Sequence, residues 1–472
     1  MIRKTLSALR RPLTAALLAG TMAVPAQAES LADTMVAAYR HSSLLDQNRA
    51  VLRAADEDVA AAIAALRPVV NWIAEHTWSS VEGVDTRQTS LALQGQITLY
   101  DFGRTQYAID RAKETVLATR AALVGVEQDV LLSAVQVYLD VRSSREQVEL
   151  QQNSVRLLGE EQQAASDRFE VGEITQTDVS LADAALAAAR ANLASAEGTL
   201  EIAAENFLAV TGHKPGNLNS PPPTPKLPAK LDEARAIAQR THPLIQQAQR
   251  TAAAAELGVA AAAAERNPTI TGSVGVSARR SNDLVRDNPF GPAREVDQTT
   301  DSASASISMS QTLYSGGRLP AAHRKAMAQR DSVRAQLLST SRQVNQSVGT
   351  AWAGIAVARA QIGAIDEQIA AAQQAYNGVR EEATLGARTT LDVLDAEQDL
   401  LQARADKISA EAQLQLAHYQ LLASMGLLTV QNLQLGIPTY DPSAYYNAVR
   451  NAPHTSTQGK SLDRVLRAIG RE

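Results

Sequence analysis

Residues 302–310 read Ser-Ala-Ser-Ala-Ser-Ile-Ser-Met-Ser, and this strict alternation predicts a β-strand with two unlike faces. Successive side chains of a β-strand point to opposite faces, so the serines share one face while the alanines, Ile307 and Met309 share the other. In residues 91–99, leucine or isoleucine at 91, 93, 97 and 99 alternates in a similar way with alanine, glutamine or threonine. Such strands suit a wall between lipid and a wet lumen. A half-buried hairpin of a soluble protein alternates in the same manner, so both interpretations stay open at this point.

The chain contains an internal duplication. A shift of 214 positions aligns residues 172–212 with 386–426, and 17 of the 41 pairs are identical. Further upstream the shift is 200, so the second copy has 14 extra residues between Pro268 and Tyr314. The polar segment 281–298, with its prolines and glycine, is expected to be a longer surface loop.

Each half is predicted to contain a helix, two strands, a long helix and a shorter helix. The predicted organisation is a signal peptide at 1–28; a first repeat at 29–235 with a helix at about 31–67, a strand pair at 69–100, a long helix at 104–170, a helix at 173–212 and a linker at 213–235; a second repeat at 236–430 with a helix, a strand pair at 269–314, a long helix at 318–385 and a helix at 387–426; and a C-terminal segment and tail at 431–472.

The two long helices lack proline over most of their length, and each would be about 100 Å long at about 1.5 Å per residue. Ile109, Val116, Leu123 and Val130 recur every seven residues, a spacing that favours left-handed supercoiling. The shorter helices of each half, placed end to end, match the long helix. This predicts a tube wall of antiparallel helices, since a plain helical bundle would leave the strand pairs unexplained.

The first 28 residues have the features of a secretory signal peptide. Four basic residues precede an apolar stretch from Leu13 to Val24, which is shorter than the roughly 20 residues that span a bilayer. The motif Ala26-Gln27-Ala28 predicts cleavage before Glu29. Removal of the four basic residues changes the formal net charge from −5 to −9, which argues against nucleic-acid binding.

After this segment no run of 18 apolar residues follows, so membrane insertion would use β-strands and thus an outer membrane. Four strands cannot close a barrel, because membrane barrels start at about eight strands. Several chains must therefore pool their strands: two copies would give eight and three would give twelve.

Enzymatic activity is not expected. The chain has no cysteine, which excludes thiol catalysis and thiolate metal sites. It also has no phosphate-binding loop, no serine nucleophile elbow and no histidine pair with metal-ligand spacing. We expect neither a cofactor nor a metal.

Three motifs resemble those of the TolC-like outer membrane factor family. They are Leu-Tyr-Asp-Phe-Gly-Arg at 99–104, Leu-Tyr-Ser-Gly-Gly-Arg at 313–318 and Gly-Ala-Arg-Thr-Thr-Leu-Asp-Val-Leu-Asp at 386–395. The resemblance covers nearly the whole chain after the signal peptide. It implies an α+β homotrimer in which four strands per chain form a twelve-stranded outer-membrane barrel. The barrel would continue into a periplasmic helical tunnel, with a belt near mid-height built from residues around 215–235 and the C-terminal segment.

The same resemblance implies a function and its partners. The trimer would be the passive exit duct of a tripartite efflux pump or a type I secretion system. It would contact outer membrane lipids, a periplasmic adaptor (membrane fusion) protein and an inner-membrane ABC or proton-driven pump. A soluble periplasmic coiled-coil adaptor or structural protein is the alternative function, and it would fractionate without detergent.

Two glycine turns join the long helices to the shorter ones. Glycine permits the left-handed turn that ends one helix before the next begins. By resemblance the adaptor docks at these turns, which consist of Val171, Gly172, Glu173, Leu385, Gly386 and Ala387. Turn chemistry alone would explain the two glycines equally well.

A gate is expected just beyond these turns. The pairs Thr175/Asp178 and Thr389/Asp392 have the spacing of a helix capping box. The family pattern implies that Arg388 is held by Thr177 and Asp178, and that this latch keeps neighbouring helices closed. A tyrosine that assists the latch in other members is replaced here by Ala383.

A second carboxylate follows one helical turn after Asp392. Asp392 and Asp395 share a helix face because they are three residues apart. Three chains around an axis would give two stacked rings of carboxylates, which by resemblance line the periplasmic constriction and attract cations.

Overall fold

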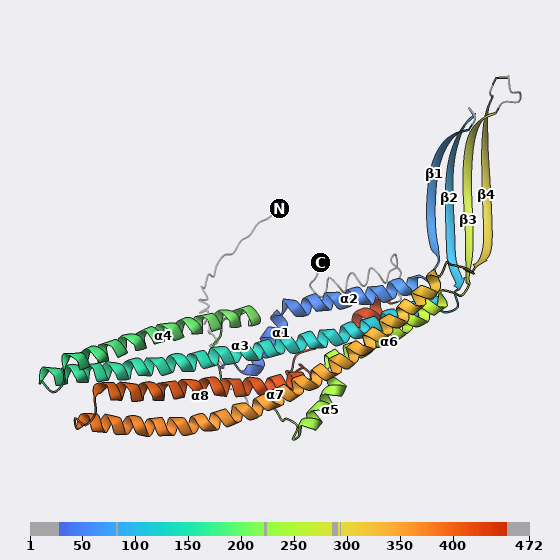
Figure 1. The fold of residues 1–472 in the computed structure, drawn as a ribbon. Coiled ribbons are helices and arrows are strands. Elements are labelled where there is room, and N and C mark those ends of the chain that lie inside the picture. The colour runs from blue at the N-terminus through green and yellow to red at the C-terminus, as the bar shows by residue number, and fades with distance from the viewer. Residues whose placement is uncertain (1–27, 82–83, 221–223, 286–290, 293, 451–472) are drawn as a thin grey trace, which may run out of the picture.

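The computed structural model describes residues 28–81, 84–220, 224–285, 291–292 and 294–450. Residues 1–27 of the predicted signal peptide and the tail from 451 to 472, which we expect to be partly disordered, lie outside this range. The molecule is elongated, with a four-stranded sheet at one end and the helices extending away from it (Figure 1). The elements in chain order are α1 (Leu31–His41), α2 (Ser43–Ala64), β1 (Val69–Val81), β2 (Val84–Tyr100), α3 (Arg104–Glu170), α4 (Gln176–Thr211), α5 (Leu231–Thr241), α6 (Pro243–Ala264), β3 (Thr269–Val285), β4 (Arg294–Ser310), α7 (Arg318–Thr384), α8 (Thr390–Ser424) and α9 (Pro442–Val449).

The order of elements repeats, as the duplication predicts. Each half has two short helices, a hairpin, one helix of 67 residues and one of 36 or 35 residues. Both 67-residue helices start directly after a glycine in the left-handed conformation, Gly103 with φ 86° and Gly317 with φ 87°. At about 1.5 Å per residue each long helix measures about 100 Å.

The helix predicted at about 31–67 is divided in two. Ser42 lies between α1 and α2 with an extended backbone, and its side chain accepts a hydrogen bond from the Leu45 amide. His242, 200 positions later, does the same for Leu244 between α5 and α6, where Pro243 takes the first helical position. The expectation of one continuous helix was therefore wrong, because a side-chain cap favours a fresh helix start at each of these two positions.

The sheet has the order β1-β2-β3-β4, and all neighbours are antiparallel. Ser281 pairs with Gln298, so the predicted loop over 281–298 was too long at both ends. Ladder hydrogen bonds use backbone groups only, which lets polar residues extend the hairpin. At the other end β4 stops at Ser310 instead of reaching the predicted 314.

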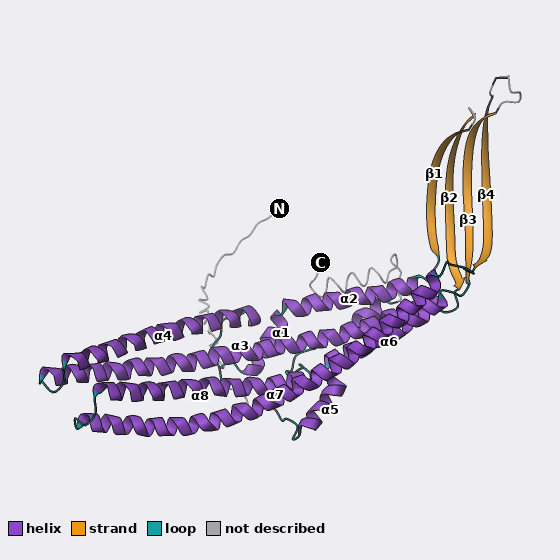
Figure 2. Cartoon of the chain, in the orientation of Figure 1, coloured by secondary structure: helices purple, strands orange, loops and turns teal. Residues whose placement is uncertain are grey.

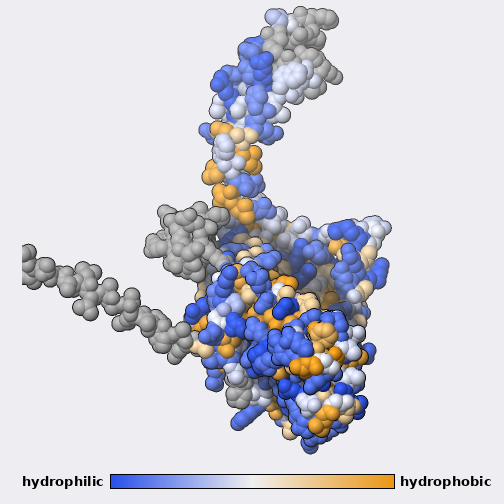
Figure 3. All heavy atoms as spheres, turned by 90° about the vertical axis from the view of Figure 1, so that its left-hand side faces the viewer, coloured by the Kyte–Doolittle hydropathy of each residue, from blue (hydrophilic) through white to orange (hydrophobic). Residues whose placement is uncertain are grey.

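The two faces of the sheet differ as the alternation predicts. One row across the apolar face consists of Trp72, Leu93, Val276 and Ala303. Hydroxyl pairs 2.7 to 2.8 Å apart lie on the other face: Thr271 with Ser308, Ser273 with Ser306, and Ser277 with Ser302. Hydrophobic side chains gather on the part of the sheet nearer the helices (Figure 3). Among the described residues no helix lies against either face of the sheet (Figure 2).

The helices pack along the seams that the sequence predicts. Ile109, Val116 and Val130 of the seven-residue series are each less than a tenth exposed. The largest buried cluster lies where α1, α3, α4, α5, α7 and α8 meet the segment 427–437, and includes Tyr138 of α3 and Phe207 of α4. By length and composition α3 and α7 each contain a stretch apolar enough to cross a membrane. Since each packs lengthwise against a shorter helix, α4 or α8, we assign these apolar stretches to helix packing.

Candidate functional site at the helix tips

Two turns form the end of the molecule farthest from the sheet (Figure 1). We call them the tips: tip 1 is residues 171–175 between α3 and α4, and tip 2 is residues 385–389 between α7 and α8. Gly172 in tip 1 has φ 80° and Gly386 in tip 2 has φ 78°. A Cβ atom at either glycine would meet no atom within 4 Å. Glycine is therefore required at both tips by backbone conformation, as predicted, and not by crowding.

The same pair of hydrogen bonds closes both helices. In tip 1 the amide of Glu173 donates to the carbonyl of Arg168 at 2.9 Å, and in tip 2 the amide of Ala387 donates to the carbonyl of Glu382 at 2.9 Å. This six-residue closure is a Schellman motif, which satisfies carbonyl groups left free at a helix end. Both tips thus have a defined backbone geometry.

An ion pair crosses each tip. The long helix supplies the cation in tip 1 and the anion in tip 2. Arg168 of α3 donates from Nε to Glu173 at 3.2 Å, whereas Glu382 of α7 accepts from Arg388 Nε at 2.9 Å. Arg168 and Glu382 occupy equivalent positions under the 214-residue shift. The hydrogen bond to Glu382 raises the pKa of Arg388, which stays a cation.

Both predicted capping boxes are present. The side chain of Thr175 accepts from the Asp178 amide while the Asp178 carboxylate accepts from the Thr175 backbone at 2.9 Å, and Thr389 and Asp392 repeat this arrangement. These hydrogen bonds lower the pKa of both aspartates, chiefly through the Thr175 hydroxyl at Asp178 and the Thr389 amide at Asp392. Both carboxyl groups are therefore ionised near neutral pH.

The single chain does not join the residues of the predicted latch. Thr177 is exposed at the start of α4, and the Asp178 carboxylate is engaged in its capping box. Among the described residues no hydrogen bond or ion pair links Arg388 to either of them. The latch stays a prediction, and within one chain the partner of Arg388 is Glu382.

Three other predicted site residues are exposed in the single chain. The apolar side chains at the two tips are largely exposed, Val171 at 73% and Leu385 at 84%. Asp395 is exposed one turn after Asp392 on α8. Within the described chain, no group of three or more His, Cys, Asp or Glu side chains has a geometry that could hold a metal ion.

One polar cluster near the tips was missed by the sequence analysis. Glu397 of α8 is only 5% exposed, and neither of its carboxylate oxygens has a hydrogen-bond partner in the described structure. The hydroxyl of Tyr376 on α7 is also buried without a partner, and Arg380 pairs with Glu161 of α3 at 3.2 Å. Burial, with a smaller contribution from Glu161, raises the pKa of Glu397 to about 7, while Arg380 opposes the shift.

The signal for Glu397 was its position in the apolar pattern. It follows Val393 by four residues and precedes Leu400 by three, and both of these side chains are buried in one cluster with Tyr376 and Ala383. A carboxylate at a core position of a helix is unusual. Ala383, in place of the family tyrosine, lies in this same cluster.

Known proteins resemble this chain in sequence over both repeats. The sequence model of the family described as "Outer membrane efflux protein" matches residues 36–213 and 235–427, one segment in each repeat. The outer membrane efflux protein BepC of Brucella suis biovar 1 (strain 1330) is 32% identical over 441 residues, covering 93% of this chain and 94% of BepC.

More distant proteins share the fold. The outer membrane protein TolC of Escherichia coli (strain K12) is 23% identical over 459 residues, covering 93% of this chain and 90% of TolC. Among solved structures, CusC superposes with a TM-score of 0.74 at 19% identity, covering 84% of this chain and 92% of CusC. The α+β architecture with four strands per chain and long helices is thus the architecture of this group of channels.

Proposed function

Because the chain belongs to the outer membrane efflux protein family, we propose that three copies form a passive exit duct through the outer membrane. The protein lies in the outer membrane, with its helices in the periplasm. It would take substrates from an inner-membrane ABC or proton-driven pump through a periplasmic adaptor, in an efflux pump or a type I secretion system. The energy would come from the pump, since the sequence of the channel contains no phosphate-binding loop that could hold a nucleotide.

The observation that carries the proposal is an amphipathic sheet with two open edges. In the described part of the chain, β1 and β4 each have one neighbouring strand, so the outer backbone groups of both lack a strand partner there. Unpaired backbone groups in hydrocarbon carry a penalty of several kcal/mol each. Pairing β4 of one chain with β1 of the next removes both edges, and three chains give a twelve-stranded barrel, well above the minimum of about eight strands.

The apolar face is close in height to the apolar band of an outer-membrane barrel. On β2 the outward apolar residues run from Leu91 to Leu99, and Leu91, Leu93 and Leu99 are about half exposed in the single chain. Eight residue steps at about 3.4 Å span about 27 Å along the strand. A strand tilt of about 40° reduces this to about 20 Å, close to the roughly 25 Å apolar band of such barrels.

The mass and solubility of the purified protein test this assembly. We expect it to be extracted from outer membranes only with detergent, to have three times the chain mass and to form pores in planar bilayers. A monodisperse, water-soluble monomer would contradict the proposal and support the alternative, a soluble periplasmic coiled-coil adaptor.

Adaptor docking at the tips has a separate test. Exposed apolar side chains at Val171 and Leu385 would be covered by the adaptor, so Val171→Ser with Leu385→Ser should weaken binding of the purified adaptor by about tenfold or more. Ile202 on α4 is similarly exposed, at 66%, but lies far from the tips. Ile202→Ser should leave adaptor binding unchanged; equal losses in both variants would argue against docking at the tips.

A further inference from the structure

Glu29, the residue predicted to become the first of the processed chain, is held firmly near the middle of the molecule. Its amide donates to the carbonyl of Asn217 at 2.7 Å, and its carbonyl accepts from the amide of Asn219 at 3.0 Å. The two segments form a short parallel β-bridge centred on Glu29 and Leu218. Residue 29 is therefore a fixed part of the fold.

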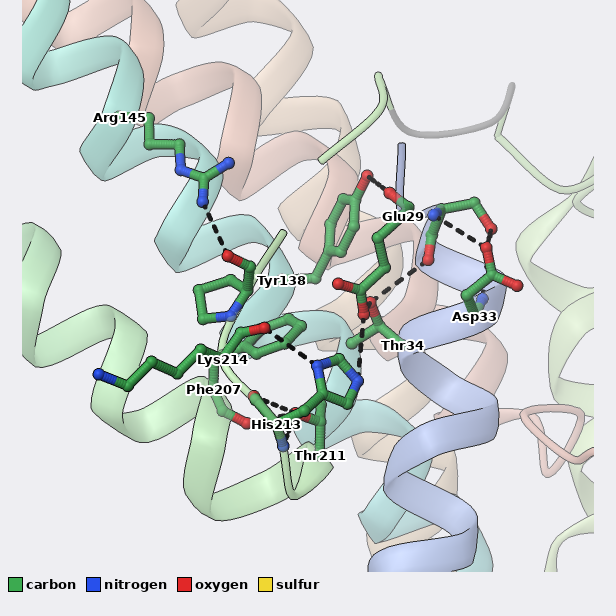
Figure 4. A network of polar contacts seen from close by, with 11 residues as sticks. Glu29, Asp33, Thr34, Tyr138, Arg145, Phe207, Thr211, His213 and Lys214 are labelled. Atoms are coloured by element: carbon green, nitrogen blue, oxygen red, sulfur yellow. Dashed lines mark hydrogen bonds and ion pairs between the residues drawn. The ribbon is translucent and has the colours of Figure 1, made fainter. Parts of the chain in front are cut away.

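The surrounding side chains also converge on Glu29. Figure 4 shows Thr34, His213 and Tyr138 pointing toward it from α1, from the loop after α4 and from α3. The Glu29 carboxylate accepts from Thr34 Oγ1 at 3.1 Å and lies 3.6 Å from His213 Nε2. The hydroxyl of Tyr138, a fully buried residue, donates to the carbonyl of Asn219.

The peptide bond between Ala28 and Glu29 is held on both sides. Its N–H donates to the Asn217 carbonyl, and its C=O accepts from Asn219 Nδ2 at 2.8 Å. This is the bond that the signal-peptide pattern marks for cleavage. Hydrolysis adds water across it: the Ala28 carboxylate leaves with the signal peptide, and Glu29 gains an α-amino group that takes up a proton to become an ammonium.

We propose that Asn217 and Asn219 form a binding site for the α-ammonium group of Glu29. This group forms only when the signal peptide is removed, and its binding would tie the start of the processed chain to the segment around residues 215–235. The Asn217 carbonyl already points at this nitrogen. With the Ala28 carbonyl gone, the Asn219 amide turns over and presents Oδ1 to a second ammonium hydrogen. An α-ammonium has a pKa near 8, so it is charged at neutral pH, and a charged donor strengthens both hydrogen bonds.

Charged groups of both signs lie near Glu29. The carboxylate of Glu29 itself and that of Asp33, which accepts from the Ser30 amide at 3.0 Å, are the nearby anions. Arg145, whose guanidinium donates to the Pro215 carbonyl, and Lys214 are the nearby fixed cations. Capture of a chain's new amine by backbone carbonyls is a known mode of recognition.

Two forms of the protein test the proposal. The processed chain begins at Glu29. The extended chain carries Gly-Ser inserted between Ala28 and Glu29, so Glu29 keeps a peptide bond after the signal peptide is removed. Mass spectrometry of each purified protein establishes its first residue, and a natural chain beginning anywhere other than Glu29 would overturn the proposal.

Asn219→Asp should act in opposite directions on these two forms. In the processed chain the new carboxylate pairs with the ammonium and should raise the melting temperature by about 2–4 °C. In the extended chain it cannot donate to the preceding carbonyl and should lower the melting temperature by a similar amount. Asn219→Leu, which removes both donor and acceptor, should lower it in both.

Asn432→Asp is the matched control, because Asn432 also donates Nδ2 to a backbone carbonyl, that of Leu427 at 2.8 Å, and its hydrogen bonds in the described structure go to residues 427 and 429. It should shift the melting temperatures of both forms equally.

Raising the pH from about 6.5 to about 9.5 should remove the gain in melting temperature that Asn219→Asp gives the processed chain, because the ammonium loses its charge. Equal shifts of the two forms by Asn219→Asp would show that no ammonium is bound. Melting followed by circular dichroism requires no channel activity, so the result stands apart from the proposed function.

Discussion

Glu397 shows what a single buried carboxyl group contributes at the residue scale. Its pKa is raised from 4.5 to about 7, mainly by burial among apolar side chains of α7 and α8. The folded state therefore holds a proton that the unfolded chain releases at lower pH. The contribution of Glu397 to stability is greatest below about pH 4.5, falls as the pH rises through about 7, and stays reduced above it.

Glu397→Gln should remove this pH dependence, because the amide is neutral at every pH. We expect the variant to melt several degrees higher than the wild type at pH 8 and at nearly the same temperature at pH 4.5, as followed by circular dichroism. Glu381→Gln on the exposed surface of α7 is the control and should change neither value. A variant that is less stable than the wild type at pH 8 would refute the interpretation of Glu397 as a strained, buried acid.

Arg388 gives the second prediction at the residue scale. If it latches neighbouring helices in the trimer, Arg388→Ser should raise the single-channel conductance in planar bilayers severalfold. Arg168→Ser, which breaks the equivalent ion pair of tip 1, should leave the conductance low. Glu382→Gln frees Arg388 from its partner within the chain and should also keep the channel closed. Equal opening by Arg388→Ser and Glu382→Gln would assign closure to that ion pair instead of the latch.

At the scale of elements, the tip glycines should respond differently from glycines within helices. Gly172→Ala or Gly386→Ala forces a Cβ into the left-handed region and should destabilise the protein by about 1–2 kcal/mol. Gly159 lies inside α3, and a Cβ added there would meet no atom within 4 Å, so Gly159→Ala should stabilise by about 0.5–1 kcal/mol. Thermal denaturation measures both signs, and a neutral result at the tips would show that these turns relax freely.

The elements that the sequence predicted correctly depend on neighbours a few residues away. The capping boxes at Thr175 and Thr389 close within three residues, and the tip glycines act on their own backbone. The features that were missed depend on distant partners. Pairing of Ser281 with Gln298 lengthens the hairpin, and the burial of Glu397 arises only where α7 packs on α8. Local sequence patterns do not predict contacts between segments that are far apart in the chain.

At the scale of the whole molecule, the chain is an incomplete part of a duct. Among the described residues nothing covers the apolar face of its sheet and both sheet edges are open, while both tips lie at the opposite end (Figure 1). Duplication supplies each chain with two hairpins and two helical tips from one ancestral unit, which explains why the family match falls into two segments. The threefold assembly that we propose would convert one exposed carboxylate into a ring of three.

The carboxylate rings lead to the last prediction, which holds only for the assembled trimer. Asp392→Asn with Asp395→Asn removes six carboxylates from the proposed constriction. Asparagine at 392 keeps an oxygen that can accept from the Thr389 amide, so the helix start should survive. We expect block of the channel by trivalent cations to weaken by about tenfold or more, because ring charges attract cations strongly in a narrow pore.

Asp331→Asn with Asp366→Asn is the control. It removes the same charge from α7, where both aspartates form exposed ion pairs, and should leave cation block unchanged. Undiminished block in the first variant would place the cation site elsewhere in the duct.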